Sequence, residues 1–165
     1  MRIVILFLNG AFGIGKTTVS RALAKRLPRA VVFDPEPLGI LLQRIRRVDD
    51  FQDLRAWRRL TIVGIRLAHI FAKHVIVPMA FSNPAYLREI RDGVGESKHV
   101  CLVASEEVVL ARLRARGVDA GEWVMRRALE CCAAHRELAP AETIPAGGAP
   151  AEIVEELLLR LRAAP

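Results

Sequence analysis

An apolar segment that runs directly into a glycine-rich loop is the feature that most restricts how this chain can fold. The segment covers Arg2–Leu8, and the loop Gly10–Thr17 reads Gly-Ala-Phe-Gly-Ile-Gly-Lys-Thr, which fits the pattern G-x-x-x-x-G-K-[ST] at every fixed position. A continuous apolar run is typical of a strand buried on both faces of a parallel sheet. Residues 15–27 have a helical pattern that ends before Pro28. We therefore predict a strand–loop–helix unit whose loop binds phosphate.

The residue types of this loop suit the polyphosphate of a nucleotide. Its glycines let successive backbone N–H groups surround a β-phosphate, and the N-terminus of the following helix adds partial positive charge. Lys16 is expected to reach the β- and γ-phosphate oxygens, and the Thr17 hydroxyl is expected to ligate Mg²⁺. The predicted nucleotide-binding residues are Gly10, Ala11, Phe12, Gly13, Ile14, Gly15, Lys16, Thr17, Thr18 and Arg112.

The rest of the chain alternates short apolar runs with longer helical patterns. Further strands are expected at residues 30–33, 75–81, 99–104 and 142–144. Such alternation predicts one α/β domain over residues 1–165, with a parallel sheet covered by helices on both faces and ligands at the carboxyl ends of the strands. Two details are expected to interrupt the pattern. Pro78 should end its strand early, and Gly64 should break the helical stretch 51–73.

Two carboxylates follow the second predicted strand, in the segment Phe-Asp-Pro-Glu at residues 33–36. Asp34 is placed to orient Mg²⁺ through water, to accept the proton of an attacking hydroxyl, or both. The alternative role of Asp34 is to cap the helix that begins at Pro35, where Glu36 is also favoured by the helix dipole. We assign Asp34 to catalysis, metal binding and the substrate site, and Glu36 to the substrate site.

An arginine-rich segment later in the chain is typical of a small closing lid. Arg112 and Arg116 are four residues apart and share one side of a helix, and Arg126 and Arg127 follow a short polar insert. Guanidinium groups brought over a transferring phosphoryl group would neutralise the charge that develops there. We expect a lid at about 116–127, with Lys16, Asp34, Arg116 and Arg126 (or Arg127 in its place) in catalysis; the alternative is a solvated arginine face.

These motifs, in this order, resemble the small P-loop kinases of the adenylate, shikimate and gluconate kinase type. A narrower resemblance, to the tunicamycin-resistance ATP-binding protein family, rests on the segments 9–17, 33–36, 50–52 with Trp57-Arg58, and 77–79. The resemblance implies a three-layer P-loop fold whose five-stranded parallel sheet has the order 2-3-1-4-5. It also implies ATP as cofactor and an association with tunicamycin, an antibiotic built on uridine. One departure is that the third strand, 75–81, has no Asp at its end.

The acceptor site is expected in the helical segment at about 38–73. Within the family-like part of that segment, the candidate substrate-binding residues are Asp50, Trp57 and Arg58. Trp57, like Phe51 and Phe71, offers an apolar surface to a uracil ring or an acyl chain, although tryptophan in such a pattern is more often part of the core.

Composition excludes several other classes. The longest apolar run is far shorter than the roughly 20 residues of a membrane-spanning helix, so a cytoplasmic protein with no membrane span is expected. The net charge of +7 comes mostly from Arg and fits an anionic ligand. Nucleic acid would also fit that charge, but a chain with one Tyr lacks an aromatic stacking platform, so no nucleic-acid partner is expected.

Two functions from different classes remain open on these grounds. The first is an ATP- and Mg²⁺-dependent phosphotransferase that modifies a hydroxyl of a small molecule, such as tunicamycin, a nucleoside, a nucleotide sugar or another metabolite. The second is an ATP-dependent protein that sequesters the antibiotic without modifying it. The missing acid after the third strand favours sequestration, whereas the lid arginines favour transfer.

Overall fold

The sheet has the predicted parallel topology. The computed structural model describes residues 4–115 and 122–163. The strands of its five-stranded sheet lie in the order β2-β3-β1-β4-β5, and every pair is parallel. Their bounds are β1 Val4–Gly10, β2 Ala30–Val32, β3 His74–Met79, β4 Ser97–Val103 and β5 Thr143–Pro145. The central strand β1 is buried along its whole length, which explains its unbroken apolar sequence.

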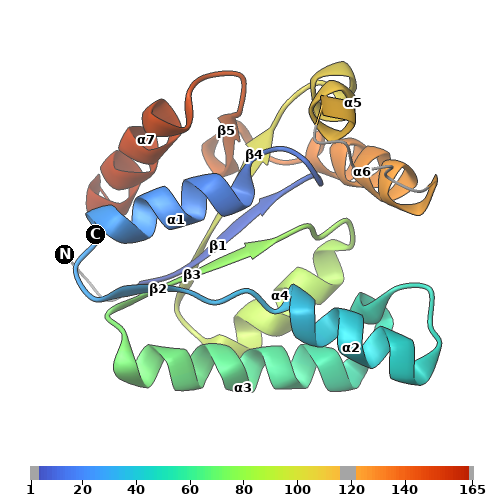
Figure 1. Ribbon diagram of the computed structural model, residues 1–165. Coiled ribbons are helices and arrows are strands. Elements are labelled where there is room, and N and C mark those ends of the chain that lie inside the picture. The colour runs from blue at the N-terminus through green and yellow to red at the C-terminus, as the bar shows by residue number, and fades with distance from the viewer. Residues whose placement is uncertain (1–3, 116–121, 164–165) are drawn as a thin grey trace.

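Helices cover both faces of this sheet (Figure 1). On one face lie α1 (Lys16–Arg26) and α7 (Pro150–Ala163); on the other lie α3 (Arg55–Phe71) and α4 (Pro84–Val94). The remaining elements are α2 (Glu36–Arg46), the 3₁₀ turn η1 (Phe51–Asp53), α5 (Glu106–Ala115), α6 (Glu122–His135) and the 3₁₀ turn η2 (Pro140–Glu142). The result is the three-layer arrangement expected from the alternation of strands and helices.

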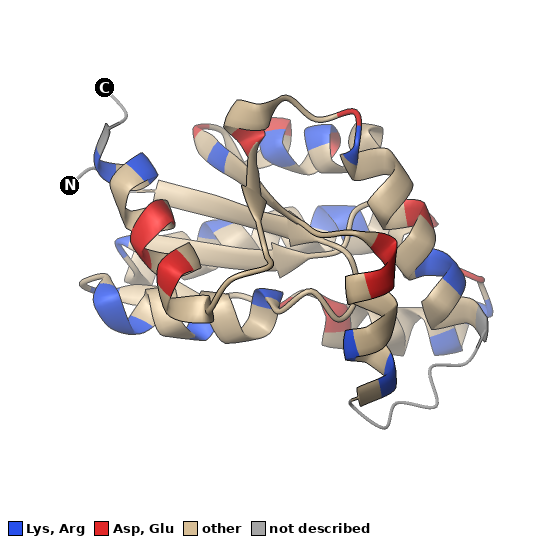
Figure 2. Ribbon diagram, turned by 90° about the horizontal axis from the view of Figure 1, so that it is seen from above, with Lys and Arg blue, Asp and Glu red and all other residues tan. Residues whose placement is uncertain are grey.

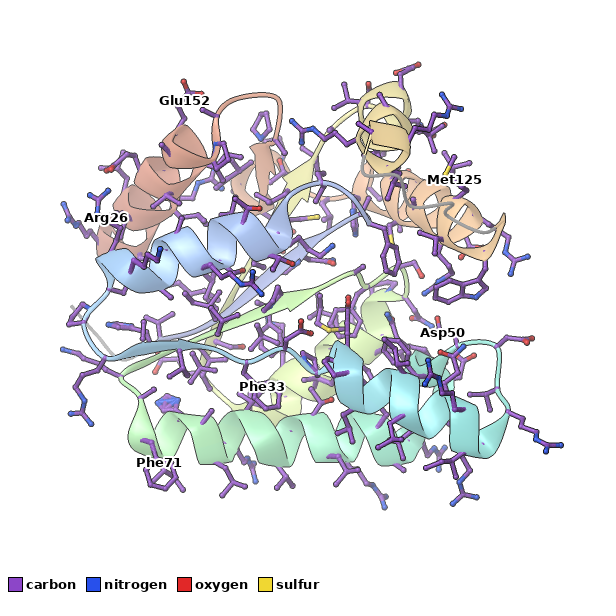
Figure 3. All side chains as sticks on the ribbon, viewed as in Figure 1. Arg26, Phe33, Asp50, Phe71, Met125 and Glu152 are labelled. Atoms are coloured by element: carbon purple, nitrogen blue, oxygen red, sulfur yellow. The ribbon has the colours of Figure 1, made fainter. Side chains whose placement is uncertain are left out.

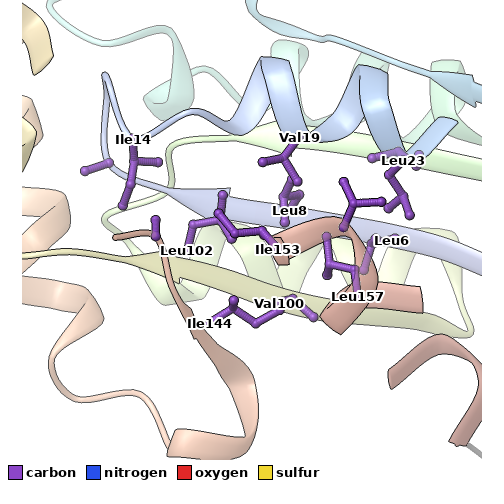
Figure 4. Packing of buried hydrophobic residues seen from close by; sticks show 14 of the residues in the cluster. Leu6, Leu8, Ile14, Val19, Leu23, Val100, Leu102, Ile144, Ile153 and Leu157 are labelled. Atoms are coloured by element: carbon purple, nitrogen blue, oxygen red, sulfur yellow. The ribbon is translucent and has the colours of Figure 1, made fainter. Parts of the chain in front are cut away.

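An aliphatic cluster fills the space between β1, α1 and α7. Leu8 of β1 and Leu23 of α1 have no exposed surface, and Leu157 of α7 joins them (Figure 4). Burying one such side chain is worth about 1.5–3 kcal/mol, so this cluster holds the two helices to the sheet. The apolar residues Ile153, Leu157 and Leu158 of α7 therefore pack on the sheet face.

An aromatic cluster fills the opposite face. Trp57 of α3 is fully buried, with its ring centroid 5.0 Å from that of Phe51 and 6.3 Å from that of Phe81. Its indole N–H donates to the carbonyl oxygen of Pro35 at 3.1 Å. Trp57 thus joins α3 to the start of α2.

Gly64 does not break its helix, contrary to the prediction, because α3 continues to Phe71. A Cβ atom at Gly64 would lie 2.4 Å from Cζ of Phe33. This glycine therefore makes room for the Phe33 ring, and packing overrides its weak helix propensity.

The strand that contains Pro78 ends at Met79, two residues short of the predicted 81, although Pro78 itself still pairs in the sheet. Pro78 pairs with Leu8 in the register of β1 and β3. The Phe33 N–H donates to the Ile76 carbonyl at 2.9 Å on the β2 side of β3, and alternate residues of a strand direct their backbone groups to the same side. The backbone nitrogen of Pro78 therefore points past Val32, the last residue of β2. Because β2 has already ended there, the missing N–H of proline removes no hydrogen bond between the two strands.

Among the described residues, no helix is long and apolar enough to cross a lipid bilayer.

Candidate active site

The glycine-rich loop has a backbone that only glycine adopts readily. Gly13 and Gly15 have φ values of 79° and 111°, in the left-handed region. A Cβ atom at Gly13 would also lie 2.8 Å from Cγ of Leu113, whereas no atom lies within 4 Å of the Cβ position at Gly15. Gly13 therefore lets α5 approach the loop closely, and Gly15 begins α1 at an open edge.

Lys16 is folded back over the loop. Its ammonium donates to the carbonyl oxygens of Gly10 and Ala11, each at 2.9 Å, and lies 5.6 Å from the centroid of the Phe12 ring. Thr17, the next residue, is exposed at the start of α1. The side chains expected to contact phosphate and metal thus leave from adjacent positions at the helix N-terminus.

Arg112 links the phosphate loop to the segment that follows β5. Its guanidinium donates to the carbonyl oxygens of Ile14 and Ala146, at 3.0 and 2.8 Å. Beside it lies a cavity of about 160 Å³, lined by Gly13, Ile14, Gly15, Thr18, Val19, Arg112, Ala146, Gly148, Pro150 and Ile153. The cavity directly adjoins the phosphate loop.

The two carboxylates after β2 have different surroundings. Asp34 is exposed, and its Oδ1 accepts the Glu36 N–H at 3.0 Å, so the capping role is present. Burial raises the pKa of Glu36, the Lys16 ammonium opposes that shift, and the Asp34 carboxylate adds to it. The Lys16 ammonium and the Asp34 carboxylate therefore both act electrostatically on Glu36, at the carboxyl end of β2.

The oxygen donors at this edge suit magnesium. Mg²⁺ usually takes one or two protein oxygens and completes its shell with phosphate and water. Thr17 and Asp34 are exposed and supply such oxygens. Among the described residues, no group of three or more His, Cys, Asp or Glu side chains forms a closed metal cage. This sparse set fits a metal that arrives with a nucleotide.

A polar cavity of about 290 Å³ lies between η1, the residues before α4, and α6. We call it the polar pocket; its lining residues are Asp49, Asp50, Gln52, Asp53, Ser82, Asn83, Tyr86, Trp123, Arg126, Arg127 and Glu130. Trp123 also meets Phe12 of the glycine-rich loop edge to face, with their ring centroids 6.1 Å apart. The polar pocket is therefore next to the phosphate loop.

Asp50 and Arg126 both line this pocket, but they differ in burial and in their partners. Asp50 Oδ2 lies 2.7 Å from Nη2 of Arg127, and Asp50 Oδ1 accepts the Gln52 N–H at 2.9 Å. Burial raises the pKa of Asp50, and the Gln52 N–H and Arg127 oppose the shift. Arg126 is 61% exposed, whereas Arg127 is 13% exposed. Arg127, the alternative to Arg126 in the sequence, is thus the arginine held inside.

The expectation that Trp57 and Arg58 contact an acceptor needs correction. Trp57 has no exposed surface. Arg58 is buried, with Nε 2.6 Å from a carboxylate oxygen of Glu89, Nη1 2.5 Å from the Gln52 carbonyl oxygen, and its guanidinium stacked 4.3 Å from the Tyr86 ring centroid. Both side chains therefore support the wall of the polar pocket from behind.

Other expected site residues lie elsewhere. Phe71 is exposed at the end of α3 remote from Asp50 (Figure 3). Arg116 and residues 117–121 of the expected lid lie outside the described residues. Conversely, Trp123 was missed by sequence reasoning because a single aromatic residue in a helical pattern resembles a core residue.

Asn9 is a second residue that sequence reasoning missed. It connects the phosphate loop to the segment that follows β3, beside the polar pocket. Its Oδ1 accepts the N–H groups of Gly10 and Phe81, both at 2.9 Å. His135 Nε2 lies 2.9 Å from the Phe81 carbonyl oxygen and 3.2 Å from Asn9 Nδ2. Burial lowers the pKa of His135. The available signal was a polar residue at the end of an otherwise apolar strand.

A family model described as "AAA domain" matches residues 5–138. The chain belongs to this AAA domain family. No curated protein sequence matches it. The tunicamycin resistance protein of Deinococcus radiodurans is a similar solved structure. It is 27% identical in sequence, with a TM-score of 0.78 over 97% of this chain and 96% of that one.

Two more distant structures share the AAA-domain fold. A gluconokinase from Sinorhizobium meliloti is 18% identical, with a TM-score of 0.65 over 99% of this chain and 100% of that one. A shikimate kinase from Acinetobacter baumannii, in complex with shikimate, is 20% identical, with a TM-score of 0.61 over 98% of this chain and 94% of that one. The chain therefore has a P-loop kinase-like fold over nearly its whole length.

Proposed function

We propose that this protein is an ATP-dependent phosphotransferase acting on a hydroxyl of a small nucleoside-like molecule. The observation that carries the proposal is the position of the polar pocket, which adjoins the phosphate loop through the contact between Phe12 and Trp123. A nucleotide and an acceptor could then meet at the carboxyl edge of the sheet. The likeness to a tunicamycin resistance protein supports tunicamycin as the first acceptor to try and antibiotic resistance as the role.

In the proposed reaction the acceptor hydroxyl oxygen forms a bond to the γ-phosphorus while the bond to the β,γ-bridging oxygen breaks. The hydroxyl proton passes to a carboxylate at the end of β2, for which Asp34 is the first candidate, and ADP leaves. The loop amides and Lys16 hold the phosphates, and the lid arginines Arg116 and Arg126 balance the charge on the transferred group.

Two residues would hold a magnesium ion, Thr17 directly and Asp34 through water. When bound, the ion would neutralise charge on the β- and γ-phosphates. The proposal places the reaction in the cytoplasm, where ATP is supplied.

Sequestration is the second candidate, and one observation favours it. Strand β3 ends at Met79 without the acid that a catalytic metal would use. A sequestering protein would use ATP to close over the antibiotic and would leave it chemically unchanged.

Mass spectrometry of tunicamycin after incubation with the protein and Mg-ATP separates the two functions. We expect the mass to rise by one phosphoryl group with the wild-type protein and to stay unchanged with Lys16→Ala, which removes the ammonium that would hold the phosphates. Unmodified tunicamycin that stays bound in an ATP-dependent way would instead establish sequestration.

A further inference from the structure

The polar pocket contains more acid than base. Its lining residues include four carboxylates, Asp49, Asp50, Asp53 and Glu130, and only two guanidinium groups, Arg126 and Arg127. This balance contrasts with the net charge of +7 on the whole chain. In the view of Figure 2, the basic positions are spread over many helices among acidic ones.

The better-buried arginine of the pocket is already neutralised by the protein. Nη2 of Arg127 lies 2.7 Å from Asp50 Oδ2. Nη1 of Arg127 donates to Glu130 Oε2 at 2.7 Å and to Ser82 Oγ at 2.9 Å. Both outer nitrogens of its guanidinium therefore have acceptors, so the fork that these two nitrogens would offer to a carboxylate or phosphate is occupied from within the chain. The buried Nε of Arg127 has no hydrogen-bond partner among the described residues.

The two neighbouring arginines differ. Arg58, behind the wall, is paired with Glu89. Arg126, at the rim, is 61% exposed and has its Nε 3.8 Å from Glu130, a loose surface pair that leaves it available to the transferred phosphoryl group. An incoming anion would have to displace a carboxylate from Arg127 and would then lie beside that displaced negative charge, which is costly in a partly desolvated site.

The pocket offers acceptor oxygens to a ligand that can donate hydrogen bonds. Gln52 is buried, its amide nitrogen donates to the Ala80 carbonyl at 3.0 Å, and its Oε1 has no hydrogen-bond partner among the described residues. The Tyr86 hydroxyl already donates to Asp53 at 2.8 Å, which leaves the oxygen of that hydroxyl free to accept. Hydroxyl and amide N–H groups on a ligand would satisfy both.

We infer that the acceptor is an uncharged molecule rich in hydroxyl and N–H donors, such as a nucleoside or an unphosphorylated sugar, and that Asp50 and Glu130 exclude carboxylate- and phosphate-bearing acceptors by occupying Arg127. This inference rests on the proposed function for the identity of the pocket.

The test compares two ligands that differ in charge, uridine and uridine monophosphate, by calorimetric titration with a non-hydrolysable ATP analogue filling the nucleotide site. In Asp50→Asn, the retained Oδ1 still accepts the Gln52 N–H, while the charge that holds Arg127 is lost. We expect the affinity for uridine monophosphate to rise at least about tenfold in this variant, and the affinity for uridine to change less than about twofold.

Asp92→Asn is the matched control because it makes the same charge change at an exposed residue of α4 that does not line the polar pocket. It should leave both affinities near the wild-type values. The inference is overturned if the wild-type protein binds uridine monophosphate as tightly as uridine, if Asp50→Asn gains no affinity for the monophosphate, or if Asp92→Asn gains as much. Should wild-type binding of both ligands be too weak to measure, the gain in Asp50→Asn decides the matter alone.

Failure of the proposed function would look different. Titration with an inert ATP analogue reports binding only, whereas transfer is followed by ADP release with ATP itself. A preference for the uncharged ligand without any transfer would retain the pocket inference and leave sequestration as the function.

Discussion

At the scale of single residues, the chemistry of each carboxylate in the site depends on its hydrogen-bond and ion-pair partners. Asp34 is exposed and caps the start of α2 with one oxygen, which leaves the other oxygen available for a proton. Asp50 is committed to Arg127 and the Gln52 N–H. Identical side chains thus have different chemistry because of their neighbours, and sequence alone shows the carboxylate but not its partner.

Asp34→Asn should abolish phosphoryl transfer while leaving ATP affinity nearly intact. The amide keeps the oxygen that accepts the Glu36 N–H but cannot take a proton, and loss of a general base typically costs about 10²–10⁴-fold in kcat. Steady-state kinetics and nucleotide titration measure the two effects. Full activity in this variant would rule out Asp34 as the base and direct attention to Glu36.

Glu36→Gln should stabilise the protein at neutral pH and have little effect in acid. Because burial raises the pKa of Glu36, the folded protein binds this proton more tightly than the unfolded chain does. The stability from that proton is present in full below the unfolded pKa and is lost as the pH rises through the folded one. Thermal unfolding of both proteins at about pH 4 and pH 7 gives the check; a larger gain at the lower pH would contradict it.

At the scale of elements, alternation of strands and helices predicted the sheet correctly, and its order followed from the family resemblance. The errors occurred where one element fits against another. Gly64 was expected to break a helix because its partner, the Phe33 ring, is far away in sequence. Arg58 was assigned to a substrate because no local pattern reveals Glu89. Packing partners distant in the chain are the information that local patterns lack.

Gly64→Ala should lower the free energy of unfolding by about 1–3 kcal/mol, even though alanine favours helix, because the new Cβ would overlap the Phe33 ring. Chemical denaturation measures the loss. Gly147→Ala is the control, because no atom lies within 4 Å of its Cβ position, and this change should stay within about 0.5 kcal/mol of wild type. A stabilised Gly64→Ala protein would show that helix propensity outweighs packing here.

At the scale of the whole molecule, the two apolar clusters meet at the site from opposite faces of the sheet. The aliphatic cluster includes Ala11 and Ile14 of the phosphate loop, and the aromatic cluster includes Phe51 and Phe81 beside the polar pocket. Arg112 adds a tie from α5 to both the loop and the segment after β5. The site is thus supported by packing on both faces of the sheet.

Arg112→Ala should therefore weaken ATP binding by roughly tenfold, the effect of losing about 1.5 kcal/mol of charge-assisted hydrogen bonding behind the loop. Binding of an uncharged acceptor should change little, because Arg112 does not line the polar pocket. Nucleotide titration makes the comparison, with exposed Arg114→Ala on the same helix as the control. Equal losses in the two variants would mean that only general charge was removed.

Asn9 has a consequence for how the two ligands influence each other. One amide oxygen accepts from Gly10, in the phosphate loop, and from Phe81, which precedes Ser82 of the polar pocket. A shift of the Gly10 N–H toward a phosphate oxygen would disturb the amide oxygen that also holds the Phe81 N–H. We therefore expect binding at either position to alter affinity at the other, and by the same factor, since such coupling is reciprocal. The protein would sense that both of its ligands are present through one shared oxygen atom.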